Sequence, residues 1–184
     1  MPNKFKKYAI SSIFIIGLLY LTSLVYTMSK MTVEEIISCS SDDAGFYIDS
    51  HICETYMKQF KTSPSDIEEL SYGGVEVILN LESDKKYEIA EFYISKGLNV
   101  DRINQYQSQF GSDFSPIHTA IFDNDLKKVN FLILNNANLM IKSQSAADLK
   151  PLEYAIYLQE KDSSIDRSKV IERLSEVIEH ITSN

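Results

Sequence analysis

Three histidines and two cysteines are the side chains best suited to catalysis or metal binding in this chain. They are His51, His118, His180, Cys39 and Cys53. No serine or cysteine stands in the sequence setting of a hydrolase nucleophile, and no glycine-rich phosphate loop is present. Acidic pairs such as Glu34–Glu35 are adjacent, so on a helix they face different directions and serve as solvated surface. We therefore expect no catalytic residues, no cofactor, no metal and no enzymatic activity.

The two cysteines have two candidate roles. In an oxidising compartment, Cys39 and Cys53 could form one disulfide that closes a short loop. With His51 they could instead supply three zinc ligands, although their spacing matches no standard zinc motif. Whether the two thiols bond depends on whether their Cβ atoms meet, and the spacing alone leaves this open.

His118 lies in "SPIHTAIFDNDLKKVNFLILNNANL", residues 115–139, which predicts two short helices. Ser115 can cap the first helix, and Pro116 suits its first turn. That helix should end near Phe122, after which "DND" supplies a turn and a new cap. The second helix has an apolar stripe at helical spacing, formed by Leu126, Val129, Leu132 and Ile133. "NNAN" ends it because Asn tolerates left-handed geometry. We expect a hairpin of helices too short to fold alone.

This hairpin resembles the ankyrin repeat, whose signature T-P-L-H-x-A recurs about every 33 residues. The positions that match the signature are Ser115, Pro116, Ile117, His118 and Ala120. The resemblance implies that the His118 imidazole bridges backbone groups of adjacent hairpins and that the Ser115 hydroxyl helps to cap the turn. His118 is therefore expected to be structural rather than catalytic.

The same pattern recurs on both sides of this hairpin. Downstream, "KPLEYAI" aligns Pro151 with Pro116, 35 residues earlier, although Glu153 stands in place of the histidine. Upstream, "YEIAEFYISKGLNVDR" matches a second helix, and "VEVILNL" a first helix without the signature residues. We predict an all-α protein with an ankyrin-repeat solenoid of about three repeats, degenerate at the ends, in residues 74–184 with C-terminal capping helices.

Residues 31–73 do not fit the repeat and predict a helical N-terminal cap. "TVEEIISC" and "FYIDSHICETYMKQF" are expected to be helices. The second helix should bury the apolar residues Phe46, Ile52, Tyr56 and Phe60. "SPSDIEEL" begins with a serine cap and Pro64 at the first helical position, and "SYGG" is expected to be a hinge. The alternative is a loose stalk, which fits the aromatic residues less well.

The first thirty residues predict a membrane or signal helix. Lys4, Lys6 and Lys7 precede an uncharged, mostly apolar run, residues 8–28, which is long enough to cross a bilayer. Because the basic side tends to stay cytoplasmic, residues 31–184 would be exported. No A-x-A site ends the run, which favours an uncleaved anchor over a cleaved signal and a soluble periplasmic domain. A buried core helix fits the flanking lysines poorly.

The exported part is strongly acidic. The chain has 18 Lys and Arg and 26 Asp and Glu, of which residues 1–30 hold four lysines and no acid. Residues 31–184 therefore carry 14 basic against 26 acidic side chains, a formal net charge of −12. This charge argues against nucleic acid and against an anionic lipid surface, and it leaves a basic protein as a favourable partner.

The resemblance implies that a partner binds the concave surface, formed by the hairpin loops and the outward side of the first helices. The candidates at these positions are Asn80, Ser83, Asp84, Thr119, Phe122, Asp123, Tyr154, Tyr157 and Leu158. Two long loops, "DRINQYQSQFGSDF" and "MIKSQSAADL", should project as fingers, with Tyr106 and Phe110 as further anchors. Phe110 and Phe114 could equally fold back on the stack, and Tyr154 could be ordinary packing between repeats.

Export, acidity and ankyrin-type hairpins together resemble the ankyrin-type immunity proteins that neutralise type VI secretion phospholipase effectors in the periplasm. By this resemblance we expect a single-pass inner-membrane protein whose periplasmic domain binds a toxin and blocks its active site. A generic exported ankyrin adaptor and a host-directed ankyrin protein are the alternatives.

Overall fold

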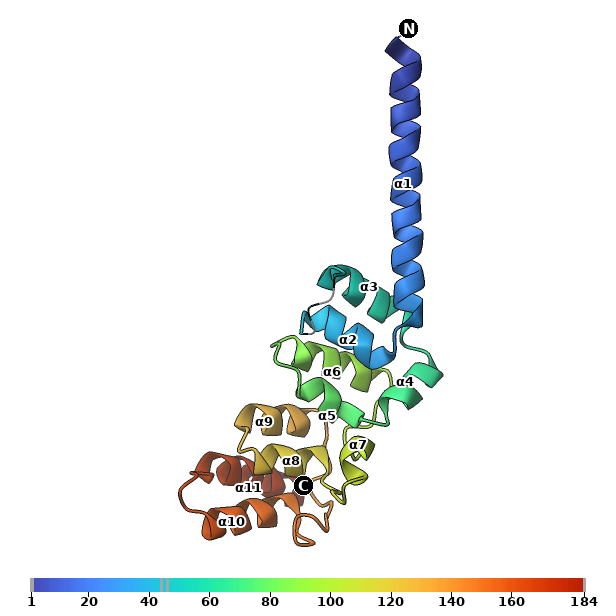
Figure 1. Cartoon of the computed structure of the whole chain (residues 1–184). Coiled ribbons are helices and arrows are strands. Elements are labelled where there is room, and N and C mark those ends of the chain that lie inside the picture. Colours follow the sequence, from blue (N-terminus) through green and yellow to red (C-terminus); the bar gives the residue numbers. More distant parts are fainter. Residues whose placement is uncertain (1, 44, 46, 184) are drawn as a thin grey trace. The chain divides into compact units, whose positions relative to one another are not determined.

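The computed structural model describes the backbone of residues 2–43, 45 and 47–183, and the side chains of residues 11–43, 45 and 47–183 (Figure 1). Every regular element in these ranges is a helix, apart from an isolated bridge between Ser143 and Leu149. The helices are α1 Pro2–Lys30, α2 Val33–Ser41, α3 Ser50–Phe60, α4 Pro64–Leu70, α5 Gly74–Leu79, α6 Lys86–Ser95, α7 Gln105–Ser108, α8 Pro116–Phe122, α9 Leu126–Leu134, α10 Pro151–Lys161 and α11 Ser168–Thr182. The all-α prediction is confirmed.

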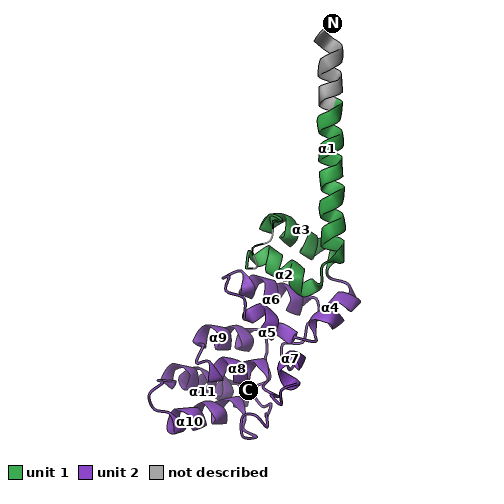
Figure 2. Ribbon diagram, in the orientation of Figure 1, with its two compact units in different colours: residues 1–61 green, residues 62–184 purple. Residues whose placement is uncertain are grey.

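The chain forms two compact units, residues 1–61 and residues 62–184 (Figure 2). The first unit holds α1 to α3 and the second holds α4 to α11. From the sequence we expected the helical cap to extend to residue 73. The two units instead divide after residue 61, which places α4 in the second unit.

α1 contains a segment, Ser11–Lys30, that is long and apolar enough to cross a membrane. Only 6% of its apolar stretch is buried, whereas a core helix of a soluble protein would be mostly buried. The segment therefore suits a membrane span or a signal sequence. The side chains of Lys4, Lys6 and Lys7 lie outside the described residues.

α2 and α3 form an antiparallel hairpin in the first unit. A capping box begins α2: the Glu35 amide donates to Thr32 Oγ1 (3.1 Å) and the Thr32 amide donates to Glu35 Oε2 (2.8 Å). The buried side chains are Val33, Ile36, Ile37, Cys39, Cys53 and Met57. Cys39 and Cys53 are joined by a disulfide, with Cα atoms 5.8 Å apart. Because both sulfurs form this bond, neither is a thiolate that could bind zinc.

The prediction of which side of α3 is buried was wrong. Ile52 is 40% exposed and Phe60 is 63% exposed, while Tyr56 is half-buried. The disulfide rotates α3 so that Cys53, and Met57 one turn later, face α2. Phe46, the fourth predicted core residue, lies outside the described residues.

The second unit contains paired helices that pack in succession. Within its described residues the pairs are α5 with α6, α8 with α9 and α10 with α11, and α8 also packs on α10 and α9 on α11 (Figure 1). The core residues of the first helices include Val75, Ile78, Ile117, Ile121 and Ala155. Those of the second helices include Ile89, Tyr93, Val129, Leu132 and Leu174. The helical-hairpin prediction is confirmed for residues 115–139.

The segment between α4 and α5 is a packed turn, although a hinge was expected at "SYGG". The Tyr72 carbonyl accepts a hydrogen bond from the Gln105 amide (2.8 Å). Gly74 has a φ of +66°, and a Cβ atom there would lie 2.7 Å from the Arg102 carbonyl oxygen. Glycine is therefore required by both conformation and close approach.

Candidate functional site

His118 connects α8 to the segment that precedes α10. Its Nε2 lies 3.1 Å from the Leu149 carbonyl oxygen and its Nδ1 lies 2.7 Å from Ser115 Oγ. A carbonyl can only accept, so Nε2 carries the hydrogen and Nδ1 accepts from the Ser115 hydroxyl. Burial lowers the pKa of His118, although the hydrogen bond to the Leu149 carbonyl partly opposes this shift. The ring is thus a neutral structural bridge to the next hairpin.

The sequence led us to expect that the Ser115 hydroxyl caps α8, and this expectation was wrong. It occupies the N-cap position, but no side-chain hydrogen bond reaches the helix amides. The hydroxyl instead donates to His118, and this orients the imidazole toward Leu149. Pro116, Ile117 and Ala120 are buried, as expected for packing positions of the motif.

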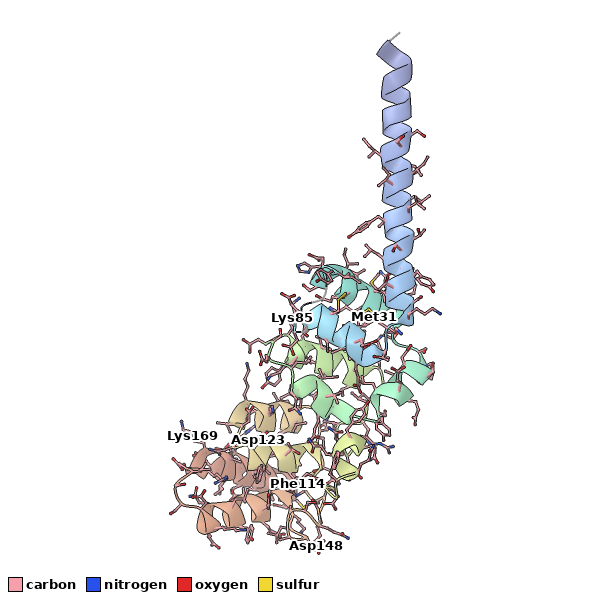
Figure 3. The ribbon with its side chains drawn as sticks, in the orientation of Figure 1. Met31, Lys85, Phe114, Asp123, Asp148 and Lys169 are labelled. Carbon is pink, nitrogen blue, oxygen red and sulfur yellow. A yellow bond between two sulfur atoms is a disulfide. The ribbon has the colours of Figure 1, made fainter. Side chains whose placement is uncertain are left out.

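A row of aromatic rings begins two residues before α8 and continues along α8 and α10. We define this aromatic row as Phe114, Phe122, Tyr154 and Tyr157. Phe114 lies 6.1 Å from the Phe122 ring and 5.8 Å from the Tyr154 ring, and Tyr154 lies 6.4 Å from Tyr157, all between centroids. Figure 3 marks Phe114 just before α8 and Asp123 at its other end. Rings from two hairpins therefore form one connected cluster.

The ends of the aromatic row are exposed and its centre is buried. Phe122 is 54% exposed and Tyr157 is 38% exposed, so both can contact a partner. Tyr154 is only 4% exposed, and its ring packs 5.7 Å from His118. Its prediction as a partner contact was wrong, because the neighbouring hairpin covers it. Phe114 folds back on the stack and supports the exposed rings.

Several predicted polar contacts are engaged within the second unit. Asn80 accepts a hydrogen bond from Lys128 (3.1 Å), and Lys128 also lies 3.6 Å from a carboxylate oxygen of Asp123. Asp84 pairs with Lys127 at 2.9 Å. Lys128 is mostly covered, but the other paired side chains are exposed. The exposed pairs therefore add little stability, and a partner's basic side chains could compete for the carboxylates.

The two long loops are held together instead of projecting as separate fingers. Asp113 accepts hydrogen bonds from the Ser145 amide (2.7 Å), the Gln144 amide (3.0 Å) and the Ser143 hydroxyl (2.9 Å). Partial burial raises the pKa of Asp113, but these hydrogen bonds outweigh burial and hold the pKa far below its usual range. One carboxylate thus fixes the loop after α9 beside the start of α8.

The two predicted loop anchors differ in their environment. Tyr106 on α7 packs edge-on against Tyr72, with ring centroids 4.8 Å apart, and remains partly exposed. Phe110 is 90% exposed, so it is free to contact a partner. The expected fold-back therefore applies to Phe114 and not to Phe110.

Glu76 on α5 is a buried acid that we did not single out from the sequence. Within the described part of the chain, its two carboxylate oxygens have no hydrogen-bond partner, and neither does the nearby Thr119 hydroxyl on α8. Burial raises the pKa of Glu76. The Thr119 and Asn104 side chains lie near its carboxylate without forming a well-aligned hydrogen bond, and with the charge of Lys128 they oppose the shift only in part. The sequence signal was an acid inside the apolar run "GVEVIL". Because Thr119 turns its hydroxyl inward, that hydroxyl cannot contact a partner.

The described side chains contain no cluster of three or more His, Cys, Asp or Glu residues able to hold a metal ion. His118, which packs against the Phe114 and Tyr154 rings, is buried and has both ring nitrogens engaged. No family model, curated protein or solved structure matches the chain.

Proposed function

We propose that this chain is a membrane-anchored, non-catalytic binding protein whose domain after α1 grips a protein partner outside the cytoplasm. The helix pairs of the second unit and the bridge from His118 to Leu149 support an ankyrin-type stack. In such a stack the first helices, α5, α8 and α10, line the concave side.

The exposed ends of the aromatic row carry this proposal. Phe122 and Tyr157 are large side chains exposed on the first helices of two successive hairpins. The half-buried Phe114 packs against Phe122 and the buried Tyr154 against Tyr157, so little conformational freedom is lost when a partner covers the exposed rings. Aromatic anchors of this kind provide most of the binding energy in many protein interfaces.

The charge of the domain favours a partner with a basic surface. Residues 31–184 have a formal net charge of −12, and Asp123 directly follows Phe122 in the sequence. Acidic side chains around an aromatic centre would steer a basic partner toward it and speed association.

Among protein partners, we propose a secreted antibacterial toxin of the type VI phospholipase class, which this protein would neutralise as an immunity protein. Support comes from the resemblance of the hairpin motif, from the apolar helix that suits export, and from the acidic domain. Neutralisation would follow when the concave side and Phe110 cover the toxin's active site.

Genetics tests the immunity role directly. Deletion of this gene alone should be harmful, and the harm should disappear when a toxin gene beside it is deleted as well. A deletion without harm, and a neighbourhood without a toxin gene, would contradict immunity and favour the adaptor or host-directed alternatives.

Binding measurements test the surface. Phe122→Ala combined with Tyr157→Ala should weaken binding to the captured partner by about 3 kcal/mol, as expected for two interface anchors. Leu134→Ala is the matched control, because Leu134 is also exposed but lies on the second helix α9. Titration calorimetry with each variant measures the change. Unchanged affinity of the double variant, with an intact fold, would move the interface away from α8 and α10.

A further inference from the structure

α3 has an exposed apolar face on the side that does not pack against α2. Cys53 and Met57 are fully buried, whereas Ile52 and Phe60 are exposed and Tyr56 is half-buried. A short helix with a wide uncovered apolar face requires an explanation, since such faces mark contacts with proteins or membranes.

This face opens into a groove beside the end of α1. The groove has a volume of about 340 Å³ and is lined by Met28 of α1 and by His51, Ile52, Thr55, Tyr56, Gln59 and Phe60 of α3. A hydrogen bond from the Lys61 ammonium to the Met31 carbonyl (2.6 Å) ties the end of α3 to the end of α1. The end of α3 therefore lies beside the end of α1 that contains Met28.

Met28 is also the last residue of the apolar run of α1. Before it, the described side chains of α1 are mostly apolar and nearly all exposed, and they include the exposed Leu21, Val25 and Tyr26. After it, Lys30 is exposed, and its ammonium lies 5.7 Å from the centre of the Tyr26 ring. Tyrosine and lysine at one end of an apolar helix are typical of the boundary between hydrocarbon and headgroups.

We propose that the exposed face of α3 lies in the membrane interface, in the outer leaflet of the bilayer that α1 crosses. This inference rests on the membrane anchoring proposed above. The occupant is lipid, because the groove reaches α1 at the buried Met28, one turn beyond the exposed apolar side chains that the bilayer would cover. Aromatic and small polar side chains, which line this groove, suit the boundary between headgroups and acyl chains.

This contact is apolar and does not require anionic lipid. The residues that line the groove include no acid and no lysine. The acidic character of the rest of the exported domain therefore does not oppose the contact, and zwitterionic phosphatidylcholine is a sufficient probe. A second contact in the interface would restrict how the domain tilts on its anchor.

The absence of tryptophan from the chain permits a direct test. Single Tyr56→Trp and Ile52→Trp variants of the full chain would be reconstituted into phosphatidylcholine vesicles with and without shallow bromine labels on the acyl chains. We expect a blue-shifted emission and a loss of fluorescence with the brominated lipid. Lys58→Trp is the matched control on another exposed side of α3, and it should keep its emission.

Two further variants separate failure of this inference from failure of the anchoring. Val25→Trp on α1 should be quenched and Phe110→Trp should not. If position 25 is quenched but positions 52 and 56 are not, the interfacial contact of α3 is overturned while the anchor stands. If position 25 is not quenched, the anchoring fails and this inference fails with it. Protection of position 56 from aqueous acrylamide without quenching by lipid would assign the face to a protein, such as a second copy, and would also overturn it.

Discussion

At the scale of single residues, His118 links the stability of the second unit to pH. The buried imidazole donates to the Leu149 carbonyl and accepts from the Ser115 hydroxyl, and this arrangement requires the neutral ring. A second proton on Nδ1 would remove the acceptor that the Ser115 hydroxyl uses. The contact between α8 and α10 therefore depends on the protonation state of one side chain.

We predict that the contribution of His118 to the free energy of unfolding falls as the pH drops below about 6.5, the pKa of histidine in an unfolded chain. The pKa of His118 is lowered in the folded protein, so the unfolded chain binds the proton first and acid favours unfolding. The loss is at most about 1.4 kcal/mol per pH unit for one proton. Urea unfolding between neutral and mildly acidic pH measures it.

His118→Gln is the control for this prediction, because the variant retains His51 and His180. It should be less stable than the natural chain at neutral pH but should lose this part of the pH dependence. The Asp113 carboxylate does not interfere, since its pKa is also lowered and its contribution is lost only at much more acidic pH. Equal pH slopes for the two proteins would contradict the role given to His118.

At the scale of elements, the disulfide determines how α3 packs on α2. It closes a loop with a sequence separation of 14 between Cys39 and Cys53. The cross-link restricts the unfolded chain and also holds the buried Met57 toward α2. The exposed apolar face of α3 follows from this orientation.

We predict that breaking the disulfide lowers the free energy of unfolding of the α2–α3 hairpin by about 3 kcal/mol, the value expected for a loop of this length. Hydrogen exchange of the α2 and α3 amides, measured with and without reductant, reports the loss locally. The Cys39→Ala, Cys53→Ala variant should match the reduced natural chain and should not respond to reductant. Exchange rates that reductant leaves unchanged would show that packing alone holds the hairpin.

At the scale of the whole molecule, the apolar run of residues 8–28 separates an N-terminal basic stretch from a strongly acidic remainder. Lys4, Lys6 and Lys7 precede the apolar run, and residues 31–184 carry the net charge of −12. This distribution of lysines favours insertion with the N-terminus in the cytoplasm.

We predict that alkaline phosphatase fused after Lys30 is active, because it would be exported to an oxidising compartment where its disulfides form. Enzyme activity in whole bacterial cells measures the outcome. Changing the lysines at positions 4, 6 and 7 to glutamate should reduce activity, because the orientation signal is removed. A silent fusion with the natural lysines would place residues 31–184 in the cytoplasm and would contradict the export proposal.

Local sequence signals determined where the helices begin and end. Pro64 and Pro116 begin α4 and α8, and Asp125 caps α9 through the Lys128 amide (2.9 Å). Asn136, with a φ of +63°, follows the end of α9. Caps, prolines and the spacing of apolar residues involve neighbours within about four positions, which is why the sequence alone reveals them.

Only the tertiary structure decided which faces became core and which polar groups paired. The Ser115 hydroxyl bonds to His118 instead of capping α8, and the Tyr154 and Glu76 side chains are buried. Ile52 and Phe60 stayed exposed because a disulfide to a distant cysteine oriented α3. Each outcome depends on contacts between different helices, such as the bridge from His118 to Leu149, where the competing surfaces meet only after the hairpins have packed.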